Sequence, residues 1–338
     1  MTAGRPAGRG GPPGDGGPSG PRRAAPGKRR LGRKVALAGT LGVALAAFGL
    51  ANTAPERVLQ AEFARQRWLA GADVRVVEVA GHRWSVLEAG AVDKPLLVLV
   101  HGFVGSKENW LPLMRELQRD YRLVAPDLPG WGDSERLDGT DYGPVAQTER
   151  LAEFLRTLPG RPALLVGHSM GGQLVGLLAA RHPGLVDRIA LMSSAGVTFE
   201  ENAFANAVLA GGNPYEVTSK AELKRFLGTV FADPPFVPWP VDEALVRRRR
   251  ADVEFEQRVL DAIGRGPEAL LLEGELGLIA APALLLWCRD DRVIDVSAAE
   301  TFRKGLRDSR TVLLSGCGHM PLMAQPKQVA EAFTAFLR

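Results

Sequence analysis

The 338-residue chain is 46% hydrophobic, which is enough for one sizeable folded core. Its formal net charge of +4 is unevenly distributed, because residues 1–34 contain nine Lys/Arg and one acid, Asp15, whereas the rest carries 33 basic and 37 acidic residues. The basic character belongs to a tail without interleaved aromatic residues, which argues against a nucleic-acid partner.

The N-terminal 54 residues indicate an exported or anchored protein. Residues 1–34 are dominated by Gly, Pro and Arg, cannot bury a core, and are expected to be disordered. Residues 35–54 are uncharged and long enough to cross a bilayer. We favour a retained transmembrane anchor; the alternatives are a signal segment cleaved near Gly49 and Ala51, with a secreted body, or a buried soluble helix. The Lys/Arg excess places the body outside the cytoplasm in both export interpretations.

Residues 55–73 form an expected linker, with a weakly amphipathic helix over 55–70. That helix either lies on the membrane surface or packs on the body.

Short apolar strands then alternate with helices. Strands are expected at 74–79, 84–88, 96–100, 122–125, 163–166, 188–192, 283–287 and 311–314. Helices are expected at 109–119, 145–158, 170–181, 298–306 and 326–336. This order predicts an α/β fold with a mostly parallel eight-stranded sheet, covered by helices on both faces and built from residues 74–195 and 278–338.

Residues 196–277 interrupt the alternation. They are predicted to be helical at 221–230 and 241–263, with a Pro-rich break at 234–240. Because an insertion of this size falls between two strands of the sheet, we interpret it as a helical cap over the carboxyl edge, where open α/β sheets bind ligands.

The segment Gly167-His168-Ser169-Met170-Gly171 fits the pattern G-x-S-x-G. It follows an apolar strand and precedes a helix, the context in which this pattern places a nucleophilic serine on a sharp turn. Ser169 is therefore the predicted nucleophile.

A serine nucleophile needs a base, and the chain has five histidines. His319 lies in a Gly-rich loop between the last strand and the last helix, where it can reach the sheet edge, and is the predicted base. His168 should point away from Ser169, and His101 is expected to have a structural hydrogen-bonding role. His82 and His182 are typical of a turn and a helix end.

The base needs an orienting acid. The segment after the strand at 283–287 offers Asp290, Asp291 and Asp295, in the chain order Ser–Asp–His of α/β hydrolases. The residue types and their spacing do not decide whether Asp290 or Asp291 orients the base, whereas Asp295 is typical of a helix cap. The two backbone donors of an oxyanion hole are expected to be the amides of Phe103 and Met170.

Together these residues resemble the α/β-hydrolase superfamily over residues 74–338. The matching segments are His101-Gly-Phe103, Asp127-Leu-Pro-Gly-Trp-Gly-Asp-Ser134, Gly167-His-Ser-Met-Gly-Gly172, Arg289-Asp-Asp-Arg292 and Gly318-His319. The chain is most similar to the membrane-anchored monoacylglycerol-lipase-like branch and related bacterial lipases. The family's G-x-x-D motif maps onto Cys288-Arg-Asp-Asp291, so the resemblance implies that Asp291 is the acid, with Cys288 in place of the glycine.

Cys288 and Cys317 each lie within a few residues of a predicted triad member. We interpret them as two small buried free thiols. The alternative is a disulfide joining the acid and histidine loops of an exported domain.

The predicted function is hydrolysis of carboxylic esters through an acyl-enzyme, without cofactor or metal. The expected partner is a small-molecule ester or lipid with an apolar acyl chain, because the predicted cap contains Phe226, Phe231, Phe236 and Trp239. Phe103 and Trp239 are the predicted substrate-binding residues. The alternatives are carbon–carbon bond hydrolysis, cofactor-free peroxidation, or a catalytically inactive binding protein on this fold. The sequence does not indicate an oligomeric state.

Overall fold

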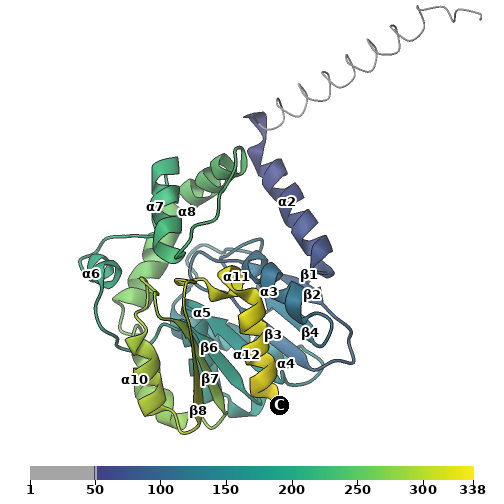
Figure 1. Cartoon of the computed structure of the whole chain (residues 1–338), viewed down its shortest axis with the longest axis vertical. Coiled ribbons are helices and arrows are strands. Elements are labelled where there is room, and N and C mark those ends of the chain that lie inside the picture. The colour runs from purple at the N-terminus through teal and green to yellow at the C-terminus, as the bar shows by residue number, and fades with distance from the viewer. Residues whose placement is uncertain (1–48, 50–51) are drawn as a thin grey trace, which may run out of the picture. The chain divides into compact units, whose positions relative to one another are not determined.

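The structure, a computed structural model, describes residue 49 and residues 52–338 (Figure 1). The expected tail (1–34) and most of the expected anchor (35–54) lie outside the described residues. Within the part of the chain that is described, no helix is long and apolar enough to cross a membrane.

The eight predicted strands form one sheet in the order β1-β2-β4-β3-β5-β6-β7-β8. The strands are β1 (Ala72–Val79), β2 (His82–Ala89), β3 (Leu96–Val100), β4 (Arg122–Pro126), β5 (Leu164–His168), β6 (Ile189–Met192), β7 (Ala283–Cys288) and β8 (Ser309–Leu314). Strand β2 pairs antiparallel with β1 and β4, and all other neighbours are parallel. The predicted eight-stranded, mostly parallel sheet is confirmed.

The central strands of the sheet are buried on both faces, as β3 illustrates. Val98 and Val100 belong to one apolar cluster, whereas Leu97 and Leu99 belong to another, because successive side chains of a strand point to opposite faces. The first cluster includes side chains of α4 (Pro144–Arg156), α5 (Met170–Arg181) and α10 (Ser297–Gly305). The second includes side chains of α3 (Leu111–Leu117) and α12 (Pro326–Leu337).

Helix α2 (Pro55–Leu69) confirms the expected helix and packs against the body of the protein. It contacts α8 and β1, and Leu59 is buried in this contact. Arg67 donates hydrogen bonds to Glu108. Trp68, by contrast, is 79% exposed. At least one side of α2 is therefore fixed by the folded body rather than available to a membrane.

The stretch between β6 and β7, hereafter the insertion (residues 196–277), contains α6 (Ala203–Leu209), α7 (Lys220–Val230), α8 (Val241–Gly264) and α9 (Leu271–Glu275). Helices α7 and α8 match the predicted helices, and they lie beyond one edge of the sheet in Figure 1. The sequence analysis missed α6, α9 and α11 (Pro321–Ala324), because helices of one or two turns are too short to show a 3.6-residue period.

Candidate active site

Ser169 lies on the sharp turn between β5 and α5, as predicted. Its backbone has φ 56° and ψ −121°, in the left-handed region that a residue with a side chain rarely adopts. The turn closes tightly around glycines: a Cβ atom on Gly167 would lie 2.2 Å from the carbonyl oxygen of Gly171, and one on Gly171 would lie 2.5 Å from that of His101. Helix α5 begins at Met170, so its N-terminal amides and dipole lie next to the Ser169 side chain.

The structure brings Asp291 to His319. The His319 Nδ1 atom lies 2.9 Å from Asp291 Oδ2 and 3.1 Å from Oδ1, and both side chains are buried. Asp291 Oδ1 also accepts hydrogen bonds from the backbone amides of Val293 and Ile294. These two amides hold the carboxylate of Asp291 in place beside Nδ1 of His319. His319 Nε2 is buried and has no hydrogen-bond partner among the described residues, and His319 lines the same cavity as Ser169.

Asp290 has a different position from Asp291. Its carboxylate accepts hydrogen bonds from the amides of Gly316 and Gly318, at 2.8 and 3.2 Å, and therefore fixes the loop that carries His319. Asp295 lies next to Val296, the N-cap residue of α10, and its side chain accepts a hydrogen bond of 2.9 Å from the Ser297 amide, the first of that helix.

Cys288 and Cys317 form a disulfide, with their Cα atoms 5.8 Å apart. The interpretation of two free thiols is therefore wrong, and the alternative is correct. The bond joins the end of β7 to the loop after β8, two neighbouring parallel strands. Together with the Asp290 hydrogen bonds, it links the segment that carries Asp291 to the segment that carries His319.

Two further buried histidines, His101 and His168, lie next to the site. The ring of His168 lies 4.9 Å from that of His319, and its Nε2–H donates a hydrogen bond of 2.7 Å to the carbonyl oxygen of His319. His101 Nε2 accepts a hydrogen bond from the Leu128 amide, and Nδ1 lies 2.8 Å from the Gly102 carbonyl oxygen. Burial lowers the pKa of His101, and burial together with the neighbouring His319 lowers the pKa of His168 to about 3. Both rings are therefore neutral at neutral pH.

The low pKa of His168 predicts an acid-sensitive fold. An unfolded histidine has a pKa of about 6.5. As the pH falls below this value, the unfolded state takes up the proton first, and stability is lost until the pH reaches the folded-state pKa. From His168 alone we expect a loss of about 1.4 kcal/mol per pH unit between about pH 6 and pH 3. Urea unfolding between pH 7.5 and 4.5 should give a shallower pH slope for His168→Gln than for the unchanged protein. Equal slopes would contradict this assignment.

The loop after β3, which contains Gly102 and Phe103, also lies beside Ser169. A Cβ atom on Gly102 would lie 2.8 Å from Ser169 Cβ, so the backbone that leads to the Phe103 amide passes directly beside the serine. The loop is anchored by Lys107, whose Nζ lies 2.7 Å from Asp127 and 2.6 Å from Asp133. Burial disfavours the charged amine, but the two carboxylates outweigh it and raise the pKa of Lys107.

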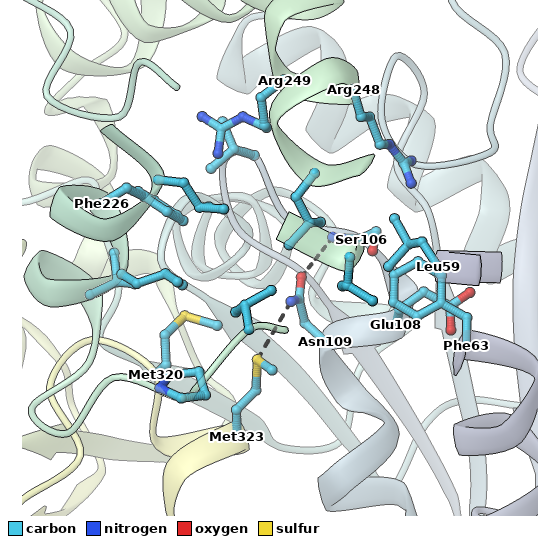
Figure 2. Close-up of a pocket in the computed structure, with 18 of the residues that line it drawn as sticks. Leu59, Phe63, Ser106, Glu108, Asn109, Phe226, Arg248, Arg249, Met320 and Met323 are labelled. Atoms are coloured by element: carbon cyan, nitrogen blue, oxygen red, sulfur yellow. Dashed lines mark hydrogen bonds between the residues drawn. The ribbon is translucent and has the colours of Figure 1, made fainter. Parts of the chain in front are cut away.

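A cavity of about 890 Å³ opens onto Ser169 and His319. Figure 2 shows Leu59 and Phe63 of α2 on one side of it, and Phe226, Met320 and Met323 on the other. Phe103, Phe231 and Phe236 also line it. The predicted substrate-binding residue Trp239 does not line this cavity, although its neighbours Val237 and Pro238 do; its side chain lies in the Pro-rich loop and is 46% exposed.

Tyr215 is a site residue that the sequence analysis missed. It comes from the insertion, lines the same cavity as Ser169, and packs its ring against that of Phe103, with the centroids 5.1 Å apart. Burial raises the pKa of the Tyr215 phenol, so the group stays protonated. No motif surrounds Tyr215, and only the folded insertion brings it into the cavity that Ser169 also lines.

Known proteins share this arrangement of elements. The profile of the "Alpha/beta hydrolase family" matches residues 97–332. Monoacylglycerol lipase ABHD6 of Homo sapiens is 26% identical over 317 residues, which cover 88% of this chain and 92% of that protein. Lipase 1 of Psychrobacter immobilis is 28% identical over 263 residues, 76% of this chain and 81% of the lipase.

Among solved structures, one described as a membrane phospholipase A, a novel bacterial virulence factor, superposes with a TM-score of 0.81 and 35% identity, covering 90% of this chain and 98% of its own. These likenesses confirm the resemblance inferred from the sequence and support the expected hydrolysis of carboxylic esters.

Proposed function

Because the chain belongs to the α/β-hydrolase family, we propose that it hydrolyses carboxylic esters of apolar acyl chains, with Ser169 as the nucleophile. The observation that carries the proposal is the buried His319–Asp291 pair, whose unpartnered Nε2 lies in the same cavity as a serine on a strained strand-to-helix turn. The relatives named as lipases support the ester as the bond that is cleaved.

In this proposal Ser169 Oγ attacks the ester carbonyl while His319 Nε2 takes the hydroxyl proton and passes it to the leaving alcohol. Asp291 holds the Nδ1–H tautomer and stabilises the imidazolium that forms. The amides of Met170 and Phe103 donate to the oxyanion, because one begins α5 and the other lies in the loop beside Ser169. Water then hydrolyses the acyl-enzyme by the same route. No step needs a cofactor or a metal.

The remaining parts of the chain have roles that fit a lipid substrate. Residues 196–277 act as a cap, since Tyr215, Phe226 and Arg249 line the cavity together with Ser169. Residues 35–54 anchor the protein in a membrane, with the body outside the cytoplasm. Helix α2, which follows this segment directly, lines the cavity through Leu59 and Phe63. The likeness to a membrane phospholipase A supports membrane association.

A panel of p-nitrophenyl esters tests the substrate class. Because the cavity wall is largely apolar, we expect kcat/KM to rise between acetyl and octanoyl esters by about tenfold or more, since each buried CH₂ contributes about 0.8 kcal/mol. In cells that express the full chain, this activity should sediment with membranes and resist a carbonate wash. Failure to hydrolyse an ester of any chain length would rule out the proposed reaction, and activity confined to the soluble fraction would rule out the anchor.

Solved meta-cleavage product hydrolases with 23–24% identity share the fold alone, and nothing in the site favours carbon–carbon bond hydrolysis.

A further inference from the structure

Four consecutive arginines, Arg247–Arg250, lie on helix α8 of the insertion. Three of them are bound to other residues of the protein: Arg247 to Glu243, Arg249 to Glu256, and Arg250 to the carbonyl oxygen of Thr218. Among the residues that the structure describes, Arg248 forms no hydrogen bond or ion pair. Its charge acts from a distance on Asp133, a carboxylate already bonded to Lys107 at 2.6 Å.

Arg248 is the member of this run that faces the substrate cavity. It lies on the same face of α8 as Val241 and Leu245, at helical spacing, and all three line the cavity. Figure 2 shows its side chain reaching from α8 toward Leu59 of α2. Arg248 also lines a second cavity of about 400 Å³, between α2, α8 and the loop after β4, which Ser169 does not line. The guanidinium is therefore positioned between the Ser169 cavity and this second space.

The other charged side chains that line the Ser169 cavity are matched by counterions. The pairs are Arg65 with Glu62, Arg136 with Asp252, Arg249 with Glu256, Glu108 with Arg67, and His319 with Asp291. Within the described part of the chain, Arg248 is thus the charge of the cavity wall that lacks a counterion. A partly buried, unpaired charge beside an apolar wall is unfavourable, and a bound anion would relieve that cost.

The position and chemistry of Arg248 narrow the kind of anion. A guanidinium presents a planar fork of donors that matches two oxygens of a phosphate or a carboxylate. In ester hydrolysis the carboxylate of the product forms at Ser169, so an anion at Arg248 would belong to another part of the substrate. Phosphate is the anionic group that lipid esters carry on their alcohol portion.

We propose that Arg248 binds the phosphate of a phospholipid or lysophospholipid substrate, while the apolar cavity takes the acyl chain. The proposal rests on the ester hydrolysis proposed above and narrows its substrate class to lipid esters that carry a phosphate. Arg248 is a specificity-determining residue and not a catalytic one, because it binds a part of the substrate that does not react.

Two esters with the same acyl chain test this role: oleoyl lysophosphatidylglycerol and monooleoylglycerol, which differ by the phosphate-bearing head group. The full-length protein is assayed with each in the same detergent micelles, and the ratio of the two kcat/KM values is compared between variants. In Arg248→Gln this ratio should fall tenfold or more in disfavour of the phospholipid, because a charge-assisted, bidentate contact is lost. A ratio within about threefold of the unchanged enzyme's would overturn the proposal.

Arg250→Gln is the matched control. Arg250 belongs to the same run and is exposed, but it lines neither cavity. Its ratio should stay within about threefold of that of the unchanged enzyme. If Arg250→Gln lowered the ratio as much as Arg248→Gln, the preference would come from the general charge of α8, and the assignment to Arg248 would be wrong.

A binding measurement separates this proposal from the proposed reaction. An ether-linked lysophosphatidylglycerol cannot be cleaved, and its Kd from calorimetry should rise tenfold or more in Arg248→Gln. Inorganic phosphate that bound as tightly, and lost this binding in the same variant, would indicate a site for a free anion and overturn the lipid assignment. If the unchanged protein hydrolysed neither ester, the proposed function would fail, whereas binding of the ether lipid would still test Arg248.

Discussion

Replacing Ser169 by alanine is expected to lower ester hydrolysis by at least about 10⁴-fold, because no other group can form the acyl-enzyme. The fold should tolerate the change. Ser169 adopts its strained backbone within a frame set by Gly167 and Gly171, and alanine keeps the same Cβ atom. Thermal unfolding of Ser169→Ala should therefore remain cooperative and close to that of the unchanged protein, so that a loss of activity reports chemistry. Activity that survives the substitution would contradict the assignment.

Asp291→Asn is expected to have the second-largest effect, a fall in kcat of about 10⁴-fold. The amide that replaces the carboxylate can donate to His319 Nδ1, which favours the tautomer with its proton on Nε2 and leaves no base for Ser169. It also removes the charge that stabilises the imidazolium. KM should change little, because Asp291 does not line the cavity. Its carboxylate is instead hydrogen-bonded to the amides of Val293 and Ile294 and to His319.

Asp290→Asn is the matched control for this substitution. Among the described residues its carboxylate accepts hydrogen bonds from the amides of Gly316 and Gly318, and the asparagine retains one acceptor oxygen. One lost hydrogen bond costs about 1 kcal/mol, so kcat should fall by no more than about tenfold. If Asp290→Asn proved as damaging as Asp291→Asn, the division of roles between the two carboxylates would be wrong.

The sequence predicted the sheet and the turn at Ser169 well, because these depend on local patterns. Continuous apolar runs were enough to predict strands such as β3 and β5. The glycines around Ser169 were informative because a side chain at Gly167 or Gly171 would collide with the backbone. His319 could be found by elimination, since few histidines follow a strand at the correct sheet edge. Residue logic did not separate Asp290 from Asp291, because the choice depends on how the loop after β7 turns; the family resemblance pointed to Asp291, which the structure places at His319.

Other parts of the site depend on contacts between distant segments. The disulfide between Cys288 and Cys317 requires β7 and β8 to be neighbours, and the preference for free thiols gave too little weight to that pairing. Tyr215 comes to the cavity that contains Ser169 through the packing of the insertion. Trp239 was chosen as a substrate contact for its size and its place in the Pro-rich break, but the chain turns so that Val237 and Pro238 line the cavity instead.

The most direct test of the account is to find which side chain becomes covalently labelled. The intact protein is treated with a fluorophosphonate, digested, and mapped by mass spectrometry. We predict one adduct per chain, on Ser169, and no adduct in Ser169→Ala. An unlabelled protein, or an adduct on another residue, would contradict the claim that Ser169 is an activated nucleophile.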